Sequence, residues 1–452
     1  MTTPPVVQYA SRTDVGMRRA ANQDSLSVRM CPEFSEWQAC GHLFVVADGM
    51  GGHAVGDLAS RITVETLPHA YFKQDAISVE ARLRQSIFAA NKAINDRSRE
   101  NREFEGMGTT CSVLSLSNRG AVVGHVGDSR VYRLRRGILQ QLTFDHSLQW
   151  EMIRLGRATA ENVEMFHPRN VITRCLGPDL HVPIDVEGPF SVETGDIFLL
   201  CSDGLTNHVS DQEVGAILAS LPPSESSRLL INLANCRGGT DNSTVIVVQV
   251  ESYPPCVPTP GDASVIPVAS PGPSPAAQSR FLSRMLIGLA ACCLVGAVAA
   301  VLFNQVVWAV AAGVIGILSL LFILLFSRRP RPAVPSLPAA ALEVSTIDST
   351  SNVQEECSAL RSSFRTSSPY RSVDCRNVEP LLSVLSEAQS ELVQAARDGQ
   401  WKVDFDELSQ LSRQARSSQQ GQKSERAVRA WARILDLLMK EIYQRVRSQP
   451  GS

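Results

Sequence analysis

The sequence predicts an α+β fold for residues 1–252, in which β-sheets are covered by helices, followed by a membrane hairpin and a helical region. Short apolar runs of strand character, separated by Gly-rich turns, recur between Val6 and Val250. Stretches in which apolar residues recur every three or four positions interrupt these runs. The strand runs include Leu43–Ala47, Val122–Val126, Ile197–Cys201 and Thr244–Val250, and the helical stretches are Ala54–Ala70, Val79–Asn101 and Asp211–Leu221.

The composition of the 452-residue chain excludes several classes of protein. Its 43 Lys and Arg against 45 Asp and Glu give a net charge of −2, whereas a nucleic-acid binder needs a basic surface that displaces counterions from phosphates. The eleven cysteines are scattered and none forms a C-x-x-C pair, which argues against a disulfide framework and against structural zinc. We therefore expect no nucleic-acid partner and a reducing compartment.

Two apolar runs follow a Pro/Ser-rich linker at residues 253–280. Residues 285–303 and 306–326 contain no charged side chain, and each run is long enough to span a hydrocarbon core of about 30 Å. Arginines precede the first run and follow the second, so the positive-inside rule places both flanks on the cytoplasmic side. Residues 1–10 lack the pattern of a signal peptide. We expect a multi-pass hairpin in the inner cell membrane; a buried apolar hairpin in a soluble domain is the alternative.

The chain after the hairpin divides into a second linker and a helical region. Residues 327–372 form a linker that ends in a Ser/Thr-rich stretch. In residues 373–448, apolar side chains recur at helical spacing from Val378 to Leu392 and from Val428 to Ile442, with a shorter stretch at Phe405–Leu411. No motif here indicates a reaction. A small helical bundle and a partner-docking module both fit the pattern.

Four aspartates lie close to glycine at the edge of an apolar run: Asp48, Asp128, Asp203 and Asp241. If the strands lie side by side, four carboxylates meet at one edge, where they repel one another unless cations lie between them. Oxygen ligands of this kind suit Mg²⁺ or Mn²⁺. The alternative for each site is ordinary Asp-Gly turn chemistry. Phosphate loops, serine-nucleophile elbows and zinc-helix motifs are absent from the sequence.

Seven motifs occur in the order seen in the PPM or PP2C family of metal-dependent Ser/Thr protein phosphatases, which residues 6–250 resemble, most closely in its bacterial members. The motifs are RAANQDS from Arg19, ADGMGGH from Ala47, GTT from Gly108, GDSR from Gly127, DHS from Asp145, SDGL from Ser202 and DN from Asp241. The resemblance implies a four-layer αββα sandwich with a dinuclear Mn²⁺ or Mg²⁺ centre at one end.

The resemblance also implies roles for individual residues. Asp48 would bridge the two metals, Gly49 would add its carbonyl, and Asp203 and Asp241 would bind the second metal. Asp128, with Asp203, matches the position of a third, weakly bound metal, and Arg19 matches the arginine that grips the substrate phosphate. A water activated by the metals would attack phosphorus without a phosphoenzyme.

Two positions depart from the pattern of eukaryotic relatives. Met50 stands where those relatives carry a histidine proposed as general acid, so another group must protonate the leaving group. His53 is a candidate for that catalytic role, and support of the Gly51-Gly52 turn is the alternative. Gln23 replaces an acidic residue and is not expected to bind metal.

The sequence therefore predicts a membrane-anchored protein Ser/Thr phosphatase whose partners are phosphorylated proteins, a Ser/Thr kinase and the lipid bilayer. The competing hypothesis is a catalytically weak PP2C-like sensor or binding module that signals through the C-terminal helices. A metal-dependent hydrolase of a small phosphorylated metabolite is a third.

Overall fold

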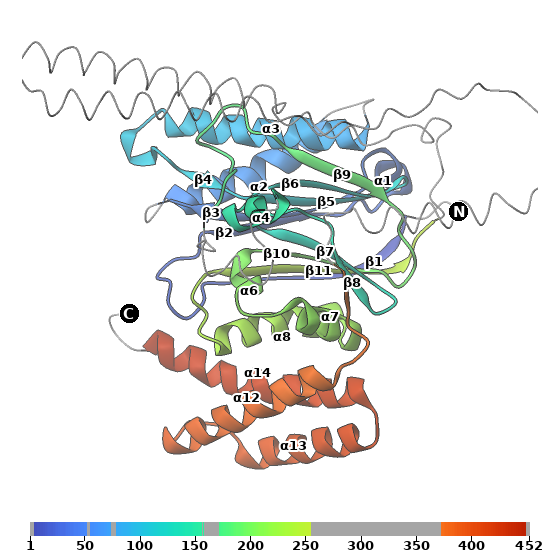
Figure 1. Cartoon of the computed structure of the whole chain (residues 1–452), viewed down its shortest axis with the longest axis vertical. Coiled ribbons are helices and arrows are strands. Elements are labelled where there is room, and N and C mark those ends of the chain that lie inside the picture. Colours follow the sequence, from blue (N-terminus) through green and yellow to red (C-terminus); the bar gives the residue numbers. More distant parts are fainter. Residues whose placement is uncertain are drawn as a thin grey trace, which may run out of the picture. The chain divides into compact units, whose positions relative to one another are not determined.

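The computed structural model describes residues 4–51, 55–73, 78–155, 157, 171–254 and 372–448. Two antiparallel β-sheets lie face to face, with helices on both outer surfaces (Figure 1). The first sheet contains, in spatial order, β1 (Val6–Asp14), β11 (Ser243–Ser252), β10 (Ile197–Cys201), β7 (Arg130–Arg135), β8 (Ile138–Gln141) and β12 (Ser372–Asp374). The second contains β2 (Asp24–Arg29), β3 (His42–Met50), β5 (Cys111–Ser117), β6 (Gly120–Val126) and β9 (Asp185–Phe190), and β4 (Gly108–Thr109) pairs with the end of β3.

The central strands are apolar throughout because both of their faces are buried. Successive side chains of a strand point to opposite faces. Phe44 and Val46 of β3 pack between the two sheets, whereas Leu43 and Val45 pack beneath the outer helices α2 (Val55–Lys73) and α3 (Val79–Ser98). These layers confirm the predicted αββα sandwich.

Helices α7 (Asp211–Ser220) and α8 (Pro223–Cys236) cover the outer face of the first sheet. Ser210 and Glu213 form a capping box at the start of α7, and this pair satisfies backbone N–H groups that the first helical turn leaves free. The remaining short helices are α1 (Phe34–Cys40), the 3₁₀ helix η1 (Arg102–Phe104), α4 (Leu148–Arg154) and α6 (Asp203–Thr206).

The C-terminal module, residues 372–448, packs on the outer side of α7 and α8. Its helices are α12 (Glu379–Asp398), α13 (Phe405–Gln420) and α14 (Ser424–Ser448), drawn in orange and red in Figure 1. Trp431 and Leu438 of α14 belong to one continuous apolar cluster with Leu218 of α7 and Leu230 of α8. Before the helices, β12 pairs antiparallel with β8 and so extends the first sheet by one strand.

The described helices differ from the sequence pattern in two ways: α1, α4, α6 and α8 were not predicted, and α13 is longer than predicted. The apolar spacing predicts a helix only over Phe405–Leu411, whereas α13 continues to Gln420. The later turns consist mainly of Ser, Gln and Arg and bury only Ala415, so they lack the apolar repeat that would reveal them. The predicted spans, residues 285–303 and 306–326, and nearly all of both linkers lie outside the described residues. Among the helices that are described, none combines the length and apolar character needed to cross a bilayer.

Candidate active site

Asp48 lies near the carboxyl end of β3, and its backbone N–H and carbonyl are hydrogen-bonded to Thr109 and Thr110. Its N–H donates to Thr110 Oγ1 at 2.9 Å, and its carbonyl accepts from Thr110 N and from Thr109 Oγ1, both at 2.8 Å. The next residue must be glycine, because a Cβ on Gly49 would lie 2.1 Å from the carbonyl oxygen of Gly56. The strand end that carries Asp48 therefore sits tightly against α2.

The structure brings the four sequence-predicted aspartates together. Asp203 follows β10 as the first residue of α6, Asp128 lies between β6 and β7, and Asp241 lies just before β11. Burial raises the pKa of Asp48 well above its ordinary value, and the negative charges of Asp24, Asp203, Asp128 and Asp241 raise it further. These carboxylates are thus neighbours at one end of the sandwich, as the pattern of strand ends predicts.

A fifth carboxylate, Asp24, was not among the predicted metal ligands. It lies directly opposite Asp48 in the register of β2 and β3. Burial raises its pKa to about 7, although hydrogen bonds to Thr244 and Ser202 oppose the shift. The motif that begins at Arg19 contains Asp24, but only the pairing of the two strands shows that it faces Asp48.

Several carboxylate oxygens of this cluster are buried without a hydrogen-bond donor. Among the described residues, Asp24 Oδ1, Asp128 Oδ1 and Asp203 Oδ1 have no partner. A buried carboxylate oxygen without a donor is costly, and a hard divalent cation satisfies it. The donor set, made only of oxygen, therefore fits Mn²⁺ or Mg²⁺.

The carboxylates are not already gathered around one point. In the part of the chain that the structure describes, no three Asp, Glu, His or Cys side chains form a closed metal-binding group. Asp241 is turned toward Arg19, whose Nη2 donates to Asp241 Oδ2 at 2.8 Å.

Arg19 projects from the loop between β1 and β2 and is about half exposed, at 48% for its side chain. Asn242 holds this loop in place: its Nδ2 donates to the carbonyls of Val15 at 2.9 Å and Ala21 at 3.0 Å, and its Oδ1 accepts from Gln23 N at 2.8 Å. The Asp241-Asn242 pair thus contributes one carboxylate to the cluster and one anchor to the arginine loop. His53 lies outside the described residues.

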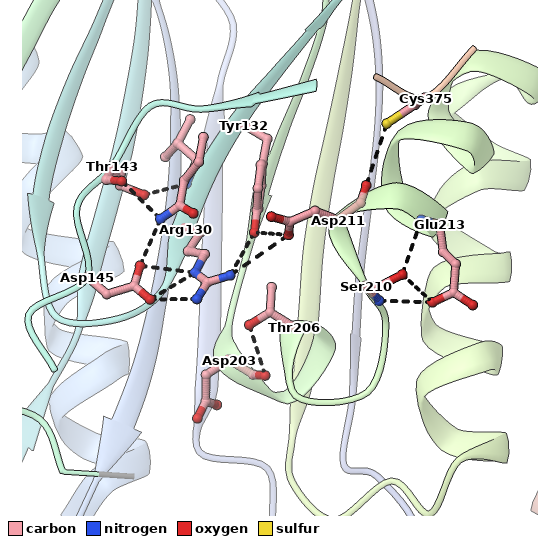
Figure 2. A network of polar contacts seen from close by, with 12 residues as sticks. Arg130, Tyr132, Thr143, Asp145, Asp203, Thr206, Ser210, Asp211, Glu213 and Cys375 are labelled. Atoms are coloured by element: carbon pink, nitrogen blue, oxygen red, sulfur yellow. Dashed lines mark hydrogen bonds and ion pairs between the residues drawn. The ribbon is translucent and has the colours of Figure 1, made fainter. Parts of the chain in front are cut away.

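Figure 2 shows a largely buried arginine, Arg130, in a polar network near Asp203. Arg130 donates from Nε and Nη2 to Asp145, with the shorter contact at 2.6 Å, and from Nη1 to Tyr132 Oη at 2.9 Å. Tyr132 Oη in turn donates to Asp211 Oδ1 at 2.9 Å. Burial raises the pKa of Asp128 to about 8, the negative charges of Asp203 and Asp145 raise it further, and the positive charge of Arg130 opposes this rise. Sequence reasoning included Arg130 in a motif without giving it this role.

The comparisons with known proteins agree with this geometry. A family model described as protein phosphatase 2C matches residues 17–228. The chain is 40% identical over 245 residues to the serine/threonine phosphatase stp of Listeria monocytogenes, covering 53% of this chain and 94% of that protein. It is 36% identical over 250 residues to a putative protein phosphatase 2C-type of Streptococcus pyogenes, covering 54% and 98%.

Among solved structures, the serine/threonine phosphatase of S. agalactiae superposes with a TM-score of 0.49 at 34% identity, covering 54% of this chain and all of that one. Two curated relatives above 30% identity are matched over 94% and 98% of their length. The family match contains Arg19, Asp48, Asp128 and Asp203, and Asp241 lies beyond its end. The chain belongs to the protein phosphatase 2C family.

Proposed function

We propose that this chain hydrolyses phosphoserine and phosphothreonine in proteins at a centre that holds two Mn²⁺ or Mg²⁺ ions. The observation that carries the proposal is the cluster of five buried or half-buried carboxylates with unsatisfied oxygens, beside an exposed arginine. The likeness to relatives named serine/threonine phosphatases supports the choice of substrate.

Asp48, the carbonyl of Gly49, Asp203 and Asp241 would hold the two cations, and Asp128 would contribute to a third, weakly bound one. Bound cations of this kind lower the pKa of water and offset negative charge on phosphoryl oxygens. Asp24 would remain beside Asp48 as a neighbouring carboxylate that accepts a hydrogen bond from Ser202 Oγ at 2.7 Å.

Arg19 would bind the phosphate of the substrate. Its guanidinium offers several N–H donors in a planar fork that matches phosphate oxygens, and it is accessible from solvent. Its present partner, Asp241, holds the side chain at the edge of the carboxylate cluster. His53 stays a candidate for protonating the leaving serine or threonine oxygen.

A phosphothreonine peptide and the full chain, purified in detergent, test this function. We expect turnover with Mn²⁺ or Mg²⁺ and none with chelator. Asp48→Asn and Asp241→Asn should each lower kcat/KM at least about a hundredfold, because each removes a charged ligand. Asp96→Asn, an exposed substitution on α3, is the matched control and should leave turnover unchanged.

Two results would redirect the proposal. A folded protein that binds Mn²⁺ without hydrolysing any phosphopeptide would favour the sensor or binding module. Rapid hydrolysis of small phosphorylated metabolites with none of the peptide would favour a metabolite phosphatase.

We propose in addition that residues 285–303 and 306–326 anchor the enzyme to the inner cell membrane, with the phosphatase domain and the C-terminal module in the cytoplasm, near phosphorylated proteins and their kinase. The uncharged length of both runs and the arginines on either side support this. Cell fractionation with an alkaline wash tests it, since an anchored protein stays in the membrane pellet. Release into the wash would contradict anchoring.

A further inference from the structure

Among the described residues, Tyr443 links the C-terminal module to the end of α8, which precedes the loop that carries Asp241. Tyr443 of α14 is half-buried, and its Oη accepts from Asn235 Nδ2 at 2.8 Å and donates to Asn232 Oδ1 at 3.2 Å. Both asparagines lie near the end of α8, just before the loop that carries Asp241. Residues 372–448 lie beyond the family match, which ends at residue 228.

Asn235 also contacts Asp14, which precedes the loop that carries Arg19. The same Nδ2 that donates to Tyr443 also donates to Asp14 Oδ1 at 2.9 Å, and that oxygen accepts from the backbone N–H of Gly16 at 2.9 Å. Asp14 is the last residue of β1, and Gly16 has a φ of +81°, so the chain turns sharply here before it reaches Arg19. A fixed Asp14 carboxylate therefore fixes this turn.

The turn is packed directly against the loop that carries Asp241. Met17 N donates to the carbonyl of Gly239 at 2.8 Å, and a Cβ on Gly16 would lie 2.3 Å from the carbonyl oxygen of Asp241. The two loops meet again at their tips, where Arg19 pairs with Asp241. A shift of the turn would therefore move Arg19 relative to Asp241.

We propose that Tyr443 is a positioning residue for catalysis, which acts through Asn235 and Asp14 to hold the Arg19 and Asp241 loops in register. The inference rests on the proposed phosphatase function, which it deepens by making the C-terminal module part of the working enzyme. Tyr443 touches neither Arg19 nor the carboxylate cluster in the described contacts, so its effect passes entirely through the two loops.

Apolar packing beside Tyr443 holds α14 against α8 and so supports the contact between Tyr443 and Asn235. Beside Tyr443, Met439 is buried and its sulfur lies 3.1 Å from Cys236 Sγ at the end of α8. At the far end of α8, Arg429 pairs with Glu225 at 2.9 Å, well away in sequence from the loops. The second of these contacts offers a control at the same interface that does not touch Asn235 or Asp14.

The experiment compares Tyr443→Phe with Arg429→Ala in the full chain. Tyr443→Phe keeps the ring and removes only the hydroxyl, so the fold and melting temperature should hold. Hydrogen exchange followed by mass spectrometry should show several-fold faster exchange in the peptide that covers residues 14–23, because Gly16, Met17 and Gln23 donate backbone N–H groups there. Arg429→Ala should leave this peptide unchanged.

Measurements of kcat and KM then test whether the position of the Arg19 loop affects catalysis. Tyr443→Phe should raise KM for the phosphothreonine peptide about three- to tenfold, with kcat within about twofold, because Arg19 is a binding group. In an Arg19→Ala background the same substitution should change KM by less than about 1.5-fold, since partners in one network are not additive.

The possible outcomes separate the two proposals. Unchanged exchange in residues 14–23 overturns the positioning role, whatever the turnover. Faster exchange with unchanged KM, or a KM effect that persists in full without Arg19, also overturns it. Absence of turnover in the unsubstituted chain overturns the phosphatase function instead, while the exchange measurement still decides whether Tyr443 holds the loops.

Discussion

The carboxyl groups of Asp24 and Asp48 face each other across β2 and β3, where burial opposes the ionisation of both. Asp128 is also buried, and its pKa is raised to about 8, chiefly by burial and then by the charge of Asp203. In the absence of a cation, protons are the groups that relieve this repulsion. A divalent cation and protons therefore compete for the same oxygens.

This competition predicts a dependence of stability on pH. An acid whose pKa is higher in the folded protein binds its proton more tightly when folded, so the free energy of unfolding falls as pH rises through the interval between the two values. That interval runs from 3.8 to about 7 for Asp24 and to about 8 for Asp128. Buried His42 and His125, with pKa values lowered to about 4 and about 3, act in the opposite direction below about pH 6.5.

With chelator present, the melting temperature of the full chain should therefore fall by several degrees between pH 6.5 and pH 8. Saturating Mg²⁺ should remove most of this fall, because bound cation stabilises the ionised carboxylates. Differential scanning fluorimetry measures both. Asp24→Asn should flatten the chelator profile and Asp96→Asn should not; a melting temperature that rises with pH in chelator would contradict the account.

At the scale of single elements, the contact between Gly215 and Cys375 joins α7 to the segment after β12. A Cβ on Gly215 would lie 2.2 Å from Cys375 Sγ and 2.7 Å from Cys375 Cβ. Cys375 Sγ also lies 3.8 Å from the carbonyl oxygen of Asp211, the first residue of α7 (Figure 2). The absence of a side chain at Gly215 therefore leaves room for Cys375 to pack against α7.

Gly215→Ala should lower the melting temperature of the full chain, although alanine in a helix interior is ordinarily about 1 kcal/mol more favourable than glycine. The added methyl group collides with Cys375 and displaces the segment that carries β12. Thermal unfolding followed by circular dichroism measures the effect. Cys375→Gly in the same chain should restore part of the loss, and a higher melting temperature for Gly215→Ala alone would show that the segment does not seat there.

The elements that the sequence predicts well are those whose pattern reflects burial. β3 and β10 are apolar on both faces, and α14 repeats its apolar residues at helical spacing, so each is visible locally. β12 is not visible, because Ser372, Val373 and Asp374 form a strand only through pairing with β8. Asp24 fails as a predicted site residue for the same reason: its approach to Asp48 depends on strand register, which is a long-range property.

At the scale of the whole molecule, the sandwich and the C-terminal module share one apolar cluster. Leu438 and Trp431 of α14 are buried in the same apolar cluster as Leu230 and Leu233 of α8. A sandwich without the module would expose this face of α8 to water, at about 25 cal/mol for each Å² of apolar surface. We expect the two parts to unfold together.

Leu438→Ala should destabilise the full chain by about 2–5 kcal/mol, because it leaves a cavity in the shared cluster. Calorimetry should show a single transition that moves to lower temperature as a whole. Val446→Ala, at a position that is 37% exposed on the same helix, is the control and should move the transition little. Two separate transitions, of which only one responds to Leu438→Ala, would mean that the module folds independently.

The return of the chain at β12 has a topological consequence. The described residues before residue 255 and those from residue 372 onward belong to one folded unit, so the chain between them is joined to that unit at both ends. Both of its ends must therefore lie on the same side of any bilayer. Whatever residues 259–361 do at a membrane, they can cross it only an even number of times, which a single-pass anchor cannot satisfy and a two-span hairpin can.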